Sequence, residues 1–386
     1  MEAVELLQIL ARGEDSQHQF KKNINNPDSL AQEIIAFSNG QGGRLIIGAD
    51  DDGSVSGLSG EDIHRINQMI SNVASQHVIP AVNPTTRNVS IQDKIVIILE
   101  VPKGINKPYQ DKDGVFWVKS GADKRKATSR EEIQRLFQSS GLVYADENPA
   151  NGLTIADLDM DYFRIFFQKR YGEKLEDQHL SLAQTIANMN LGKGGELNLA
   201  AALLFGKNPS HRLPSFIVKA GSFPGQSITT ETYLESKDIA GKISDIFQQT
   251  MSFILANIRH IQGERTVNST GEPEIPRIVL EELLVNALVH RNYFISAPVR
   301  VFIFSDRVEI ISPGHLPNNL TIENIKAGNS NSRNPVLASF ANQILPYRGY
   351  GSGILRALEN YPTIEFEDNR DGNLFKCIIK RSRSLM

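Results

Sequence analysis

The sequence predicts a chain of mixed helix and strand domains: an α+β domain at the N-terminus, a helical connector, and an α/β domain at the C-terminus. Of its 386 residues, 40% are hydrophobic and 22% are charged, which is enough for two or three domains with sizeable cores. Helical and strand-like patterns occur together at both ends, and a polar segment with Pro and Gly at 146–152 predicts a linker. We therefore place the domains at 1–140, 141–270 and 271–386.

The first 140 residues combine helices with a strand. Residues 1–11 fit a short amphipathic helix, and a second helix begins at Asp28 or Ser29, either of which could cap it. Glycines at 40, 42 and 43 then allow the positive φ and the close backbone approach that a turn before a strand needs. The strand Leu45–Gly48 and a hairpin-like turn at 50–55 follow.

Several short segments of this unit resemble the AlbA_2 domain that Schlafen proteins share with bacterial DNA-binding proteins. They are Glu14, Gln19–Lys21, Ala36–Asn39, Gly42–Gly43, Gly48–Asp51 and Phe116–Thr128. The resemblance implies an AlbA-like α+β fold that contacts DNA or RNA. Basic side chains can contact phosphates without reading sequence, although a charge run is also typical of a solvated loop. The candidate phosphate contacts are Lys21, Arg44, Lys119, Lys124, Arg125 and Lys126.

The same resemblance raises the alternative of a metal-dependent nuclease. In the nuclease members of the Schlafen group, two glutamates and an aspartate form the metal site, and the matching positions here are Glu14, Gln19 and Asp50. Gln19 keeps an oxygen but has no charge. Removal of one of three carboxylates weakens a site that must hold a divalent ion. A nuclease therefore stays as an alternative rather than the leading expectation.

The middle of the chain predicts a small helical module. Helical patterns run through Tyr162–Phe166, Thr185–Met189 and Leu197–Phe205, followed by a strand near 216–220 and a long amphipathic helix at 239–261. Residues 199–209 resemble the middle segment of RecG-like proteins. We find no catalytic constellation here, and we expect the module to orient or couple the two ends of the chain.

The stretch Arg277–Tyr293 predicts a buried helix with one polar stripe. Apolar residues cover two faces, and Glu282, Asn286 and His290 lie between them at four-residue spacing. Buried polar groups must find partners or lose roughly 1 to 3 kcal/mol each. A carboxylate and an amide one turn apart can hold a water and a hard cation such as Mg²⁺. The alternative is that these side chains only bridge other elements of the core.

This helix resembles the ATP-binding helix of the divergent GHKL-type domain found at the C-terminus of RecG-like bacterial proteins. The resemblance implies that Glu282 activates water, that Asn286 binds Mg²⁺, and that His290 and Arg291 belong to the site of ATP. It also implies an α/β sandwich in which helices cover one face of an antiparallel or mixed sheet.

Two later segments fit the same layout. The glycine-rich turn at 348–354 opens a helix, which is a favourable site for an anion, and the resemblance brings Gly349, Gly351 and Gly353 close to the triphosphate. Arg333 lies in a matching Ser-Arg-Asn-Pro run, and residues 318–334 predict a mobile lid. Ordinary GHKL domains carry Asp-x-Gly-x-Gly, whose Asp accepts from the adenine amino group; the nearest counterpart here is Ser312-Pro313-Gly314.

The overall composition restricts partners and location. The formal net charge is −3, so any contact with nucleic acid is a local patch. The single cysteine, Cys377, excludes an intramolecular disulfide and a cysteine-rich zinc site, and fits a reducing cytoplasm. No stretch fits a signal peptide or a bilayer span of about 20 residues. We expect a cytoplasmic homo-oligomer without membrane contact.

The leading functional hypothesis is an ATP-binding, and in its stronger form ATP-hydrolysing, nucleic-acid-associated regulator. In it, the nucleotide state of the C-terminal domain controls the N-terminal domain or the oligomer. The chain has no Gly-x-x-x-x-Gly-Lys-[Ser/Thr] phosphate loop, so a helicase motor of the usual kind is not expected. The alternatives are the nuclease and a non-catalytic assembly scaffold in phage defence or transcriptional control.

Overall fold

The computed structural model describes residues 3–139, 143–229, 232–261, 271–317 and 320–381. The chain divides into two compact units, Met1–Val143 and Tyr144–Met386. Both units are mixtures of helices and sheets, which confirms the predicted fold class. The predicted domain boundaries at 140 and 270 fall outside the described residues.

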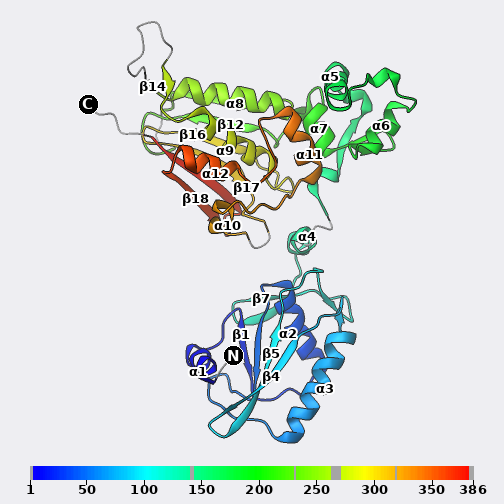
Figure 1. Ribbon diagram of the computed structural model, residues 1–386, viewed down its shortest axis with the longest axis vertical. Coiled ribbons are helices and arrows are strands. Elements are labelled where there is room, and N and C mark those ends of the chain that lie inside the picture. Colours follow the sequence, from blue (N-terminus) through cyan, green and yellow to red (C-terminus); the bar gives the residue numbers. More distant parts are fainter. Residues whose placement is uncertain (1–2, 140–142, 230–231, 262–270, 318–319, 382–386) are drawn as a thin grey trace. The chain divides into compact units, whose positions relative to one another are not determined.

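The first unit is built on a four-stranded sheet in the order β1-β2-β5-β4 (Figure 1). β1 is parallel to β2, and the other neighbours are antiparallel. The elements of this sheet and its helices are α1 (Ala3–Arg12), β1 (His18–Lys21), α2 (Pro27–Asn39), β2 (Gly43–Ile47), α3 (Gly60–Gln76), β4 (Thr85–Ile91) and β5 (Lys94–Val101). The smaller elements are β3 (Val78–Ile79), β6 (Gln110–Asp111), β7 (Trp117–Ser120), β8 (Asp123–Lys126) and α4 (Arg130–Ser139).

Helices cover both faces of this sheet because successive residues of a strand point to opposite sides. In β2, Leu45 and Ile47 belong to the core that packs against α2 and α3. Ile46, between them, belongs to a second core with Leu6 and Leu10 of α1. The sheet is thus the buried middle layer of the unit.

The cap of α2 differs from the expectation of Asp28 or Ser29. Asn26 is the N-cap, and its side-chain oxygen accepts from the backbone N–H of Asp28 at 2.9 Å and of Ser29 at 3.1 Å. Pro27 follows as the first helical residue, where its lack of an N–H costs nothing. The helix therefore begins one to two residues earlier than predicted.

The second unit begins with a short helical and strand region. Residues 146–152, predicted as a linker, instead form part of η1 and of β9, which pairs with β11. Its elements are η1 (Ala145–Glu147), β9 (Pro149–Thr154), η2 (Ile155–Asp157), α5 (Met160–Tyr171), η3 (Leu175–Asp177), α6 (Leu182–Asn188), β10 (Gly192–Lys193), β11 (Glu196–Asn198), α7 (Leu199–Phe205) and η4 (Pro209–His211).

A six-stranded mixed sheet in the order β13-β12-β16-β17-β19-β18 forms the rest of the second unit. β12 and β16 are parallel, and all other neighbours are antiparallel. The strands are β12 (Val218–Ser222), β13 (Glu235–Ile239), β16 (Val299–Ile303), β17 (Arg307–Pro313), β18 (Ile364–Asn369) and β19 (Leu374–Lys380), and a separate pair is formed by β14 (His260–Ile261) and β15 (Glu272–Pro273). β12 and β13, from the segment expected to be a connector, are thus continuous with the C-terminal sheet.

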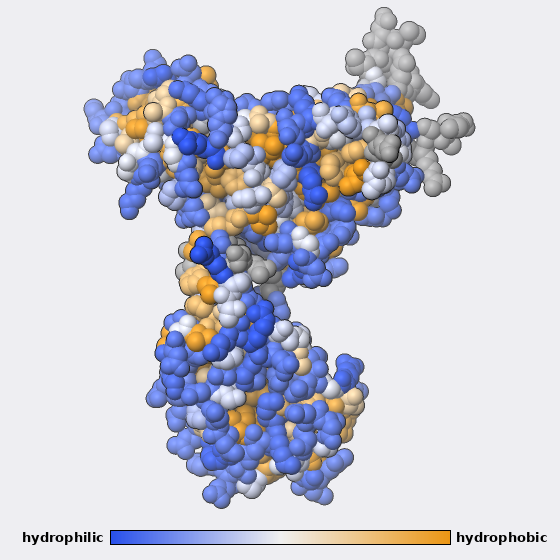
Figure 2. All heavy atoms as spheres, turned by 180° about the vertical axis from the view of Figure 1, so that it is seen from behind, coloured by the Kyte–Doolittle hydropathy of each residue, from blue (hydrophilic) through white to orange (hydrophobic). Residues whose placement is uncertain are grey.

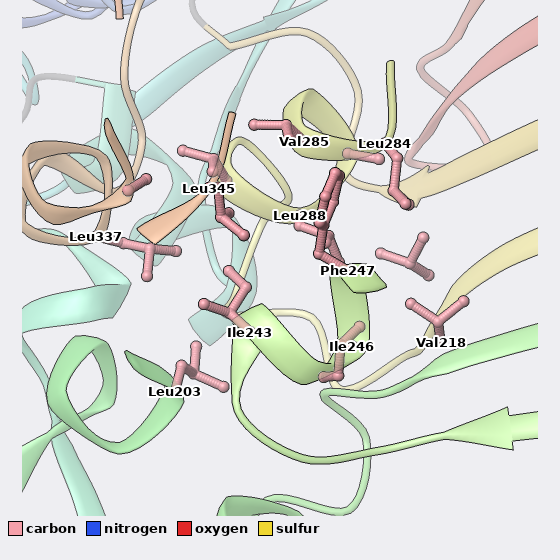
Figure 3. Packing of buried hydrophobic residues seen from close by; sticks show 14 of the residues in the cluster. Leu203, Val218, Ile243, Ile246, Phe247, Leu284, Val285, Leu288, Leu337 and Leu345 are labelled. Atoms are coloured by element: carbon pink, nitrogen blue, oxygen red, sulfur yellow. The ribbon is translucent and has the colours of Figure 1, made fainter. Parts of the chain in front are cut away.

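Helices pack on this sheet around one continuous core (Figure 1). They are α8 (Ile243–Asn257), α9 (Arg277–Val289), α10 (Ile322–Lys326), α11 (Pro335–Ile344) and α12 (Gly353–Asn360). α9 contacts β17 and has α8 and α12 as neighbours. Figure 3 shows why α9 is apolar on two sides: Leu284 and Leu288 meet Phe247 of α8, and Val285 lies on the side of Leu345. The polar side chains of this helix therefore lie between its two apolar faces.

Hydrophilic residues cover most of the face shown in Figure 2, with apolar residues in small patches. Within the described segments, no helix has the length and apolar character needed to cross a bilayer.

Candidate nucleotide-binding site

The polar stripe of α9 lines a cavity of about 120 Å³ in the second unit. Glu282, Asn286 and His290 extend along it over about 12 Å, because the helix rises 1.5 Å per residue. The other predicted residues that line it are Gly314, Arg333, Gly349, Gly351 and Gly353. Residues distant in sequence therefore meet in one cavity, between α9, the end of β17 and the glycine-rich turn before α12.

Glu282 makes a close ion pair that the sequence analysis missed. Its Oε1 lies 2.5 Å from Nη2 of Arg356 on α12, and both side chains are largely buried. Burial raises the pKa of the Glu282 carboxyl, while Arg356 and then Arg348 lower it in part. The available signal was the position of Arg356, which follows Gly353 by three residues and so lies on the first turn of the helix that the glycine turn opens.

Gly353 allows the start of α12 to approach α9. A Cβ atom at Gly353 would lie 2.5 Å from Oε2 of Glu282 and 3.3 Å from Nδ2 of Asn286. The backbone at the N-terminus of α12 therefore lies against both polar residues. The first N–H groups of a helix have no intrahelical partner and, with the helix dipole, favour an anion there.

His290 is a neutral hydrogen-bonding group at the other end of the stripe. Its Nε2 lies 3.0 Å from the hydroxyl of Tyr347, a lining residue that the sequence analysis also missed. Burial, assisted by the charge of Arg333, lowers the pKa of His290 to about 4. The imidazole is therefore uncharged near neutral pH and cannot act as a cation toward phosphate.

Arg333 lies against Gly314 near this end of the cavity. Gly314 has a φ of +99°, and a Cβ atom there would lie 2.5 Å from Cβ of Asn292 and 2.6 Å from Nη1 of Arg333, so only glycine fits. Burial lowers the pKa of Arg333 to about 10, which leaves the guanidinium charged at neutral pH. Asp368 is the nearby acid, but its oxygens accept from the N–H of Leu316 and from Arg370.

Arg291, the remaining predicted residue of the nucleotide site, is not among the residues that line the cavity. Its guanidinium donates to the carbonyl oxygens of Ile295 at 3.1 Å and Ala297 at 2.5 Å. It also packs over the rings of Phe216 and Tyr293. These contacts explain its burial and give it a structural role in the loop after α9.

The cavity carries an excess of positive charge. Among its described lining residues, Glu282 is the one acid, whereas Arg333, Arg348 and Arg356 are cations. One negative charge against three positive charges attracts an anionic ligand. The remaining wall is largely apolar, as expected for a pocket that also takes a ring system.

The donors present fit a magnesium ion only in part. Asn286 offers one amide oxygen, and Glu282, one turn away, is already paired with Arg356. Across the described ranges, no group of three His, Cys, Asp or Glu side chains is arranged to hold a metal. Mg²⁺ is commonly held by one or two protein ligands together with substrate phosphates and water, and Asn286 suits that mode.

Part of the predicted lid borders the cavity. Leu320, Ile325 of α10, Asn329, Ser330 and Asn331 line it together with Arg333. Asn318 and Asn319, also predicted to belong to the lid, lie outside the described residues. Closure of the segment stays a prediction.

In the first unit, most candidate phosphate contacts are paired with acids. Lys21 lies 4.0 Å from Asp51, and Arg44 lies 3.3 Å from Glu5. The loop residues Lys119 and Lys124 both approach the buried Glu33, and Arg125 forms two bonds to Glu132. Lys126 packs over the ring of Trp117 and has no carboxylate partner in the described part of the chain. The cluster is therefore largely neutralised.

The three positions matched to the nuclease site are also occupied by protein contacts. Glu14 accepts from the backbone N–H of Phe20 at 2.7 Å, and Asp50 lies 3.6 Å from Lys22. The Gln19 side-chain oxygen accepts from the Lys119 ammonium at 2.5 Å. A lysine thus approaches the one position that lacks a carboxylate.

Two family models match the chain, one in each of its two units. Residues 14–128 match the family model of the Schlafen AlbA_2 domain. Residues 296–376 match the model described as "Putative ATP-dependent DNA helicase recG C-terminal". The chain is therefore similar to the Schlafen AlbA_2 family over most of its first unit and to the RecG C-terminal family over part of its second unit. The second match begins after α9 and so does not include Glu282 and Asn286. These two residues belong to the candidate site because they line the cavity.

No curated protein matches the chain. Solved structures similar to it include two of low sequence identity. The DIP2311 protein from Corynebacterium diphtheriae is 18% identical, with 99% of this chain and 69% of that chain covered and a TM-score of 0.46. The N-terminal domain of a putative ATP-dependent DNA helicase RecG-related protein from Nitrosomonas europaea is 22% identical, with 34% and 96% covered and a TM-score of 0.24.

Proposed function

We propose that the second unit binds a magnesium nucleoside triphosphate, with ATP as the expected nucleotide, and that its occupancy regulates the nucleic-acid contacts of the first unit or its assembly. The observation that carries the proposal is the cationic cavity along α9, where one acid faces three arginines and a helix N-terminus. A triphosphate supplies the missing negative charge. The RecG-like match over 296–376 favours ATP among the triphosphates.

The lining residues divide into distinct roles under this proposal. The glycine-rich turn and the first amides of α12 bind phosphate oxygens, and Asn286 contributes an amide oxygen to the bound ion. A bound Mg²⁺ would neutralise phosphate charge. Glu282 is the one carboxylate among the described lining residues, so we assign to it the acceptance of a proton from an attacking water. Hydrolysis is the stronger form of the proposal, and binding alone is sufficient for regulation.

The first unit supplies the contact with nucleic acid in this proposal. The AlbA_2 match supports that role, whereas the pairing of Lys119, Lys124 and Arg125 with acids argues for a weak, salt-sensitive contact. The nuclease alternative is less favoured because the Lys119 ammonium is bonded to Gln19. Degradation of RNA by the wild type, lost in the Glu14→Ala variant, would favour the nuclease.

The first experiment is isothermal titration of the full chain with ATP and GTP in Mg²⁺, followed by turnover assays with and without DNA or RNA. We expect Asn286→Ala to lose Mg²⁺-dependent binding, and Glu282→Ala to bind without turnover. Glu281→Ala is the matched control, because Glu281 precedes Glu282 but pairs with Arg277 and is not among the lining residues. No binding at millimolar nucleotide would refute the proposal. Concentration-dependent oligomers unaffected by Glu282→Ala would then favour a scaffold.

A further inference from the structure

We propose that Arg356 has two alternative partners: the Glu282 carboxylate, with which it forms the ion pair seen in the structure, and the terminal phosphate of a triphosphate, to which it moves when that ligand binds. The inference rests on the proposed function, because it assigns a role within the same cavity. Binding of the correct ligand would then release the carboxylate that the reaction needs.

The contact between Arg356 and Glu282 is short, and it leaves part of the guanidinium without a partner among the described residues. Arg356 Nη2 lies 2.5 Å from Glu282 Oε1, with 19% and 7% of the two side chains exposed. The Nε of Arg356 is buried and has no hydrogen-bond partner among the described residues. A guanidinium has five N–H donors in a fixed fork. The pair therefore leaves donors of Arg356 unused inside a cavity that is built for an anion.

A terminal phosphate is a stronger partner for this guanidinium than Glu282 is. Arginine binds phosphate through two parallel, charge-assisted hydrogen bonds, whereas the ion pair with Glu282 joins Nη2 to Oε1 and leaves Nε without a partner among the described residues. Arg356 also lies on the first turn of α12, directly after the glycine-rich turn expected to carry the phosphates. A small movement of its long side chain is enough to exchange one partner for the other.

The exchange has a chemical consequence for Glu282. In hydrolysis, the water oxygen forms a bond to the terminal phosphorus, the bridging P–O bond breaks, and the diphosphate leaves with the electron pair of that bond. The proton of the attacking water passes to the Glu282 carboxylate. A carboxylate that is held by an arginine is a weaker base, so release of Arg356 makes Glu282 a better acceptor at the moment when a triphosphate is present.

The charged groups that act on Glu282 among the described residues come from three segments of the second unit. Arg356 comes from α12, Arg348 from the glycine-rich turn, and Glu281 from α9 itself. Burial and the charge of the Glu282 carboxylate also raise the pKa of the Tyr347 hydroxyl. Among these groups, Arg356 contacts Glu282 directly, at 2.5 Å.

The test is a double-mutant cycle on the affinity for a magnesium-bound, non-hydrolysable ATP analogue and for ADP. Glu282→Gln removes the competing charge but keeps the shape, so we expect it to tighten analogue binding about 5- to 10-fold. Arg356→Ala is expected to weaken it about 10- to 100-fold and to leave ADP binding nearly unchanged. In the double variant the gain from Glu282→Gln should disappear, since no arginine remains to be released. Glu281→Gln is the matched control.

A merely structural pair gives different results. If Arg356 only holds α12 against α9, both single variants weaken the binding of the analogue and of ADP to the same extent, and both lower Tm. The two substitutions then change the affinity for the analogue in the same direction. That result overturns the inference. Arg356→Lys, which keeps the charge but not the fork, provides a folded intermediate case if the alanine variant is unstable. In the wild type, absence of any nucleotide binding refutes the proposed function itself, whereas normal binding without coupling refutes only the role of Arg356.

Discussion

The carboxylate of Asp146 accepts a hydrogen bond of 2.8 Å from the backbone N–H of Leu337, and both residues are buried. Leu337 lies in the first turn of α11, whose N-cap Asn334 donates to the carbonyl oxygens of Val289 and Arg291 at the end of α9. Two sets of hydrogen bonds therefore attach the start of α11, one to the beginning of the second unit and the other to the end of the helix that carries the polar stripe.

Asp146 should make the stability of the second unit depend on pH. Burial raises its pKa to about 6, above the value of about 3.9 for an unfolded chain. The folded state therefore holds the proton more tightly, so this stabilisation is complete below about pH 4 and is lost as the pH rises through 6. Two pKa units correspond to about 3 kcal/mol. Asp146→Asn, which can still accept from Leu337, should remove this dependence.

Urea unfolding of both proteins between pH 4 and 7.5, followed by circular dichroism, measures the difference. Other groups titrate in both proteins, so the comparison is the change in slope between them. Identical slopes would show that Asp146 does not titrate in this range.

Asn334→Ala should affect both stability and nucleotide binding. The variant leaves the carbonyl oxygens of Val289 and Arg291 without their donors inside the core, at a cost of about 1 to 3 kcal/mol. It also loosens the segment that places Arg333 in the cavity. Asn342→Ala, on the exposed side of the same helix, should change stability by no more than about 0.5 kcal/mol. Equal effects of the two variants in thermal unfolding would contradict this account.

Substitutions of Arg333 and Arg291 should have different effects: the first should weaken nucleotide binding, and the second should lower the stability of the fold. Arg333→Ala removes a charged group from the cavity wall, so we expect at least a tenfold loss of triphosphate affinity with Tm nearly unchanged. Arg291→Ala removes a buried cation bonded to Ile295 and Ala297 and packed on two rings, so we expect a loss of about 2 to 4 kcal/mol of stability. Titration calorimetry and thermal unfolding of both variants give the comparison, and a reversed pattern would place the nucleotide beside Arg291.

Gly353→Ala should disturb the cavity without straining the backbone. Gly353 begins α12 and its φ is not positive, so alanine suits the helix, but the added Cβ would lie 2.5 Å from Oε2 of Glu282. The carboxylate must shift, and we expect a loss of turnover larger than the loss of binding. Gly60→Ala at the start of α3, where no atom lies within 4 Å of the new Cβ, is the control. Unchanged turnover in Gly353→Ala would argue against Glu282 as the proton acceptor.

Lys126 and Lys124 should behave differently in nucleic-acid binding. Lys126 is exposed beside Trp117, so Lys126→Glu should weaken binding and reduce its salt dependence. Lys124 bonds to the buried Glu33 at 2.9 Å, so Lys124→Ala should lower the Tm of the first unit. Fluorescence anisotropy with labelled DNA and RNA at several salt concentrations tests the first expectation. Nucleic-acid binding that is unchanged in the Lys126→Glu variant would place the contact elsewhere on the unit.

Local pattern was enough to predict the elements that carry the cavity. The apolar residues of Arg277–Val289 mark a helix buried on two sides, and the intervening polar positions mark its functional stripe. The glycines at 349, 351 and 353 likewise mark a turn and a helix start. Spacing along one element is visible in the sequence because a helix repeats every 3.6 residues.

Long-range partners were beyond the reach of the same reasoning. Nothing in the local sequence places β12 and β13 beside β16, because strand pairing depends on which edge is left uncovered after the helices pack. Gln19 accepts a hydrogen bond from Lys119, a hundred residues away. A position matched to a carboxylate of the nuclease site therefore contacts a lysine. Arg291 directly follows the stripe in sequence, yet the turn after α9 directs it toward Phe216.

The sequence by itself determined that a buried helix carries Glu282, Asn286 and His290 and that a glycine-rich turn opens a later helix, because periodicity and backbone freedom are local properties. Only the tertiary structure decided that the two face each other and that Arg356 pairs with Glu282. The same holds for the excess of cations in the cavity. Those features depend on distances between elements, and packing of the whole core decides such distances.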